Sequence, residues 1–70
     1  MYLPVLIKFD KPSIQLGKKS LVMALPDDGV LLDHVWRYMA RPHVQEWFKG
    51  CRVIWIEGIG EVEMLIEDFV

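Results

Sequence analysis

The residues whose side chains could react or bind ligands are concentrated in one segment of this sequence, "HVWRYMARPHVQEWFKGC", residues 34–51. The segment contains both histidines, the only cysteine, two of the three tryptophans and two arginines. Side chains of these types can ligate metals, transfer protons, attack electrophiles or bind anions. Their spacing along the chain decides which of these chemistries the segment supports.

The spacing of the histidines and the cysteine argues against a metal centre. His43 follows His34 by nine positions, and Cys51 follows His43 by eight. Zinc sites use closely spaced ligand pairs that a single turn presents together. Cys51 also opens an apolar stretch, where a thiol is typical of a core residue and not of a nucleophile held beside a base. We therefore expect no metal, no cofactor and no catalytic residue, and we favour a non-enzymatic protein.

The other polar residues of the segment have two interpretations. Arg37 and Arg41, four residues apart, could receive a phosphate or carboxylate, and an ion pair between Arg37 and Asp33 also explains their spacing. An alternative function is therefore a small-molecule-binding protein or minor enzyme, with a pocket between helices and sheet or at a subunit seam. Its candidate lining residues are His34, Tyr38, Arg41, His43, Glu46 and Trp47.

Four strands are expected from the side-chain pattern. Apolar alternation predicts strands at 2–9 and 19–25, β-branched and aromatic residues predict one at 51–57, and alternation predicts its return at 61–69. Because Pro4 cannot donate to a neighbouring strand, the first strand should be an edge or begin near this proline.

Two helices are expected between the second and third strands. Apolar residues at three- and four-residue spacing predict a helix over 28–40, and Pro42 starts a second short helix that stops at Gly50. The chain thus forms a single small α+β domain over 1–70, of order ββααββ. Its four-stranded, largely antiparallel sheet carries one or two helices packed on one face.

The register of the last hairpin stays open between two loops. A two-residue turn at Gly58 and Ile59 pairs Ile56 with Glu61, whereas a three-residue loop that includes Gly60 pairs Ile56 with Val62. The three-residue loop is preferred. In either register the 51–57 strand is apolar on both faces, and one helix layer covers only one of them.

The uncovered face of the sheet predicts self-association. Val53, Trp55 and Leu65 are expected to be exposed there, and soluble monomers avoid such apolar patches. Burial against a second copy is the simplest remedy, so we expect a homo-oligomer, most simply a dimer.

The net charge of −2 conceals an uneven distribution. Residues 1–52 contain all eight Lys and Arg with five acidic residues, whereas residues 53–70 contain five acidic residues and no Lys or Arg. Glu61, Glu63 and Glu67 form an acidic row that either meets a basic protein partner or prevents further strand pairing. The acidic balance argues against direct nucleic-acid binding, since that requires neutralisation of phosphates.

The remaining composition indicates a compartment. No apolar run approaches the length of a membrane span or forms a signal peptide, and a single cysteine is typical of a reducing environment, so we expect a cytoplasmic protein. The preferred hypothesis is a non-enzymatic, self-associating interaction or regulatory module with an acidic C-terminal hairpin.

Overall fold

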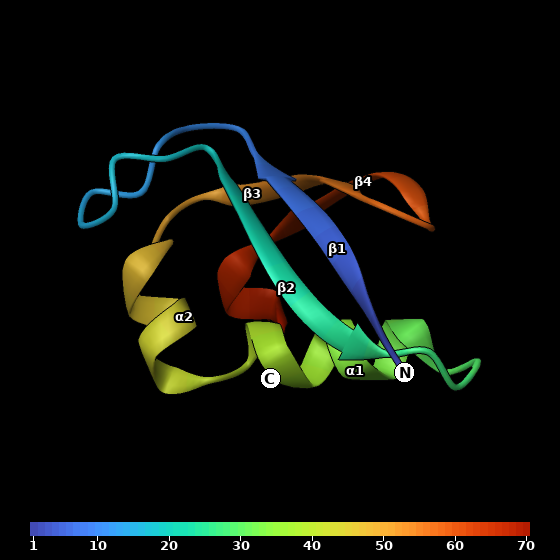
Figure 1. The fold of residues 1–70 in the computed structure, drawn as a ribbon. Coiled ribbons are helices and arrows are strands. Elements are labelled where there is room, and N and C mark those ends of the chain that lie inside the picture. Colours follow the sequence, from blue (N-terminus) through green and yellow to red (C-terminus); the bar gives the residue numbers. More distant parts are fainter.

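The computed structural model describes all residues from 1 to 70 and confirms the ββααββ order of an α+β fold. The strands form one antiparallel sheet of order β2-β1-β3-β4, and the helices lie against one of its faces (Figure 1). The elements are β1 (Tyr2–Phe9), β2 (Ser20–Pro26), α1 (Leu31–Met39), α2 (Pro42–Trp47), β3 (Arg52–Ile56), β4 (Gly60–Leu65) and the 3₁₀ turn η1 (Ile66–Asp68).

The core lies between the sheet and the helices. Strand alternation sends every second residue of β1 and β2 toward the helices, as predicted, because successive side chains of a strand point to opposite faces. The rings of Phe9 and Phe48 stack at its centre with centroids 3.7 Å apart. The buried apolar residues are Val5, Ile7, Phe9, Met23, Leu25, Val35, Met39, Val44, Phe48, Cys51, Val53, Ile56, Ile66 and Phe69.

Pro4 lies in a central strand, so the prediction of an edge strand is wrong, while the alternative that the strand begins near this proline is confirmed. The Leu6 carbonyl accepts a hydrogen bond from the amide of Glu57, the residue after β3, at 2.9 Å. Pro4 therefore lies beyond the end of β3, where an amide would have no strand to bond.

The first helix begins at Leu31, later than predicted. Asp27 to Val30 form a turn instead, in which an Asp28 carboxylate oxygen accepts the Val30 amide at 3.3 Å. Pro42 is the first residue of α2, as predicted, since its ring favours a helix start and it needs no amide partner there. None of the helices has the length and apolar character that a membrane crossing requires.

The register of the last hairpin differs from the preferred prediction. Ile56 pairs with Gly60, so the loop is Glu57-Gly58-Ile59, and the Gly-Ile-Gly loop is wrong. A bulge then shifts the register by one residue, and Val53 pairs with Met64. Beyond the bulge this is the register of the two-residue alternative.

The same bulge corrects the prediction for Val53. Ile54 and Trp55, consecutive residues, both remain exposed, at 39% and 36%, which allows Val53 and Ile56 on either side of them to face the core. Val53 is 0% exposed and cannot belong to an exposed face.

Candidate functional site

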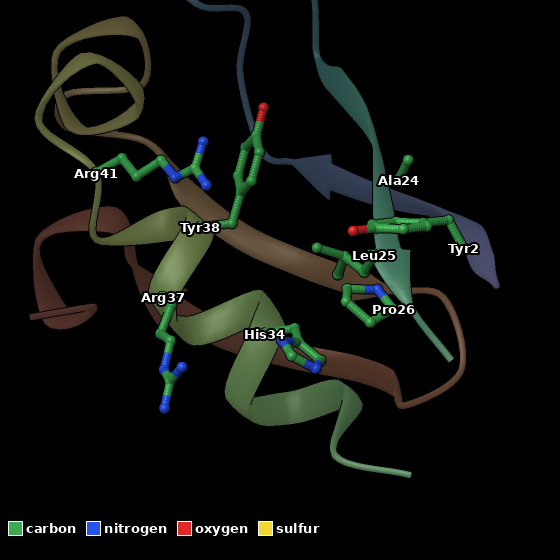
Figure 2. A pocket seen from close by; sticks show the side chains of 8 residues that line it. All are labelled: Tyr2, Ala24, Leu25, Pro26, His34, Arg37, Tyr38 and Arg41. Carbon is green, nitrogen blue, oxygen red and sulfur yellow. The ribbon is translucent and has the colours of Figure 1, made fainter. Parts of the chain in front are cut away.

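A hollow of about 400 Å³ lies where the C-terminal half of β2 passes α1 (Figure 2). Three of the predicted pocket residues, His34, Tyr38 and Arg41, line it: His34 and Tyr38 share one side of α1 at four-residue spacing, and Arg41 follows in the link before α2. The full lining is Tyr2, Ala24, Leu25, Pro26, His34, Arg37, Tyr38 and Arg41.

Charge in this hollow is only partly neutralised. His34 Nε2 lies 3.0 Å from both carboxylate oxygens of Asp28, and this contact holds the pKa of Asp28 below its ordinary value. No lysine or arginine lies within ion-pair distance of a carboxylate, so the alternative pairing of Arg37 with Asp33 is not formed.

The two arginines of the hollow point in different directions. The Arg41 guanidinium lies 4.9 Å from the centre of the Tyr38 ring, whereas the Arg37 guanidinium is directed away from that ring (Figure 2). They are cations without carboxylate partners, but they do not converge on one point. No serine, threonine or cysteine lines the hollow, so His34 has no such hydroxyl or thiol there to activate.

The other predicted pocket residues lie on α2, outside the hollow. His43 and Glu46 are exposed, and the His43 ring meets the Trp47 ring edge-on with centroids 4.8 Å apart. Trp47 is half-buried against the core. The six residues expected to line one pocket are therefore divided between two surfaces.

Cys51 is buried, as predicted, at 2% exposure. Its thiol lies 3.7 Å from the Lys11 carbonyl oxygen, and burial raises its pKa above the ordinary value. Nowhere in the structure do three or more His, Cys, Asp or Glu side chains gather as a metal site would require.

Two polar residues that sequence reasoning did not single out hold loops onto the core. The Ser13 hydroxyl donates to the Trp47 carbonyl at 2.5 Å and accepts the Leu16 amide at 3.0 Å. The Gln45 side-chain amide reaches the carbonyl oxygens of Met39, Ile66 and Phe69 at 2.7, 2.7 and 3.1 Å. Three of these five hydrogen bonds join residues that lie 21 to 34 positions apart in the sequence. No local sequence pattern predicts such contacts.

The sheet face turned away from the helices, called here the open face, has no layer over it (Figure 1). The apolar residues that its strands present are Leu6, Val22, Ile54, Trp55 and Leu65. Val22 is 63% exposed, and Trp55 lies under the ammonium of Lys8 at 5.7 Å. Trp55 and Leu65 were predicted on this face, and Ile54 takes the place of Val53.

The predicted acidic row is shorter than expected. Glu61 and Glu63 are exposed on β4, but the strand ends at Leu65 and Glu67 belongs to η1. The Glu67 carboxylate accepts the Gly50 amide at 2.9 Å, which ties it to the turn before β3. Two glutamates, not three, therefore lie along the strand.

No protein-family model, curated protein or solved structure matches this chain. Function is therefore inferred from the hollow, the open face and the distribution of charge.

Proposed function

We propose that this protein is a non-enzymatic interaction module that self-associates through the open face of its sheet. The observation that supports this best is a central tryptophan, Trp55, on a sheet face that no helix covers. Burying a large apolar side chain contributes about 1.5–3 kcal/mol relative to leaving it exposed. A second copy can supply that cover for Trp55 and Ile54 together.

The charges of the open face complement one another between two copies. Lys8, Trp55 and Glu61 pair across neighbouring strands and so form one row over β1, β3 and β4. A two-fold axis along β3 would stack Trp55 on the partner's Trp55 and place Glu61 against the partner's Lys8. Opposite charges at such positions favour one orientation of the pair.

Light scattering during size-exclusion chromatography tests this proposal. We expect the wild-type chain to exceed 8.2 kDa and Trp55→Lys to lower its mass, because a charge replaces the apolar centre of the interface. Ile14→Lys is the matched control, since Ile14 is 93% exposed in the loop before β2. A wild-type monomer at high concentration, or an unchanged mass for Trp55→Lys, would contradict the proposal.

The glutamates of β4 and the buried cysteine add a partner and a location to the same proposal. Glu61 and Glu63 offer a protein partner with a basic surface a place to bind when they are not buried between copies. A lone buried thiol fits a cytoplasmic location, where cysteines stay reduced.

A second candidate function is binding of a small anionic molecule in the hollow between α1 and β2. It is favoured by Arg37 and Arg41, which line the hollow without carboxylate partners. Titration with inorganic phosphate, followed by the amide NMR signals of α1, would show shifts that Arg41→Ala abolishes. No shift at millimolar phosphate would remove this candidate.

A further inference from the structure

The outer edge of β2 is unprotected. β2 is the first strand of the sheet order, and only β1 pairs with it. No charged residue lies within Ser20–Pro26, and its one proline stands at the last position, whereas natural sheets usually guard their edges with charges or prolines. The strand is flanked by Lys18 and Lys19 before it and by Asp27 and Asp28 after it, in the sequence "KKSLVMALPDD".

The hydrogen bonds to β1 reveal which backbone groups of β2 are free. The Phe9 amide donates to the Lys19 carbonyl at 2.7 Å, and the Asp27 amide donates to the Met1 carbonyl at 2.9 Å. Bonded pairs recur at every second residue of an antiparallel ladder, so the odd-numbered residues of β2 face β1. Ser20, Val22 and Ala24 therefore present their amides and carbonyls to the free edge, and Pro26 presents a carbonyl alone.

We propose that two copies of this chain join β2 to β2, antiparallel, about a two-fold axis at Met23. Val22 then bonds to the partner's Ala24 through both backbone groups, and the symmetric pair does the same. The Ser20 amide reaches the carbonyl of the partner's Pro26. The result is a continuous eight-stranded sheet, an interface beyond the sheet-face contact of the proposed function.

Charge and hydrogen bonding select the same register. With Met23 on the axis, Lys19 lies opposite the partner's Asp27 and Lys18 opposite the partner's Asp28. A slip of one residue would turn bonded backbone groups away from each other, and a slip of two would separate the charges. Lys18, Lys19 and Asp27 form no ion pair within the chain, so their charges remain for a partner.

The surface along this edge is hollowed at both ends. The 400 Å³ hollow adjoins Ala24, Leu25 and Pro26, and a second hollow of about 370 Å³ is lined by Leu16, Lys18, Ser20, Leu21 and Val22. The two-fold axis brings the first hollow of each copy to the second hollow of the other. Leu21 would lie opposite the partner's Leu25, which supplies apolar contact beneath the joined strands.

Replacing Ala24 by proline tests the edge directly. The Ala24 amide has no partner within the chain, so Ala24→Pro removes only a donor aimed at the second copy. We expect the mass by light scattering to fall below that of the wild type, with an unchanged far-ultraviolet circular dichroism spectrum. Ala24→Val, which keeps the amide, should retain the wild-type mass. A wild-type mass for a folded Ala24→Pro would overturn the inference.

Charge exchange supplies a second test that leaves the backbone intact. Lys19→Glu alone and Asp27→Lys alone should each raise the dimer dissociation constant about tenfold, since each sets like charges opposite one another twice per dimer. The double variant Lys19→Glu/Asp27→Lys should restore it. Failure of the double variant to recover would contradict the pairing of these residues.

Cysteine cross-linking tests the register of the proposed β2-to-β2 pairing. Paired residues of an antiparallel sheet have Cα atoms about 5.5 Å apart, within disulfide reach. Mixed Val22→Cys and Ala24→Cys chains should form a disulfide-linked dimer under mild oxidation, and either variant alone should not. Trp55→Lys separates the two interfaces: if it lowers the mass while Ala24→Pro does not, the proposed function stands and the β2 pairing is wrong.

Discussion

At the residue scale, the polar side chains that stabilise the fold are not the histidines and the cysteine that drew attention in the sequence. Both histidines lie at the surface or half-buried, and the single cysteine is buried. Gln45, by contrast, joins the end of α1 to η1 and the C-terminal residues through three carbonyl oxygens. A half-buried polar side chain that satisfies several backbone acceptors is costly to remove.

Replacing Gln45 tests this role. Gln45→Leu keeps a similar volume but removes the side-chain donor from the carbonyls of Met39, Ile66 and Phe69, of which Ile66 keeps only the Phe69 amide, so we expect the free energy of unfolding to fall by about 2 kcal/mol. Urea denaturation followed by tryptophan fluorescence measures the change. The exposed neighbour is a control, and Glu46→Leu should alter stability by less than about 0.5 kcal/mol. Equal effects of the two variants would argue against the carbonyl contacts.

The Cys51 thiol should make stability depend on alkaline pH. Burial raises its pKa above the ordinary value of 9.0, so the unfolded chain loses this proton before the folded chain does. The stabilisation is therefore complete below pH 9.0 and is lost as the pH rises through the folded-state pKa. Urea midpoints of the wild type should fall more steeply above pH 9 than those of Cys51→Ala. Parallel curves for the two proteins would contradict this.

At the element scale, local patterns predict most of the fold, and the exceptions have identifiable causes. Alternation places β1 and β2 within a residue or two of their observed bounds, and Pro42 marks the start of α2. The bulge in β3 escapes prediction because "RVIWI" is apolar at all but one of its positions. With no polar residue after Arg52 to mark the outward face, the sequence cannot show that Ile54 and Trp55 both point away from the core.

The candidate site shows the same limit. Helical spacing unites His34 and Tyr38 on one side of α1, whereas Arg41 joins them from the link between the two helices. It cannot reveal that Tyr2, far away in the sequence, completes their hollow through the pairing of β1 with β2, nor that α2 directs His43 elsewhere.

The turn between β3 and β4 requires glycine at its centre. Gly58 has φ +88°, and a Cβ atom there would lie 2.9 Å from Leu31 Cδ2. We expect Gly58→Ala to lower the unfolding free energy by about 1–2 kcal/mol, through left-handed backbone strain and this contact. Gly29→Ala is the matched control, because Gly29 has φ +86° with nothing within 4 Å. If thermal denaturation shows equal losses for both variants, the Leu31 contact contributes nothing.

At the scale of the whole molecule, the uneven distribution of charge is not neutralised by ion pairs within one chain. Residues 53–70 carry only acids, and none of the eight Lys and Arg side chains forms an ion pair with them. A domain of this size also buries a smaller fraction of its surface than larger domains do. Association would therefore relieve two weaknesses together, the exposed apolar surface and the unpaired charge.

The placement of Glu61 and Glu63 has a consequence for how wide the joined sheet can grow. If β2 joins β2, the outermost strand at both ends of the eight-stranded sheet is β4, and both ends present the same negative charges. Two such ends repel, so one sheet does not add to another edge to edge. The glutamates would therefore limit one continuous sheet to eight strands, because both of its outer edges carry charges of the same sign.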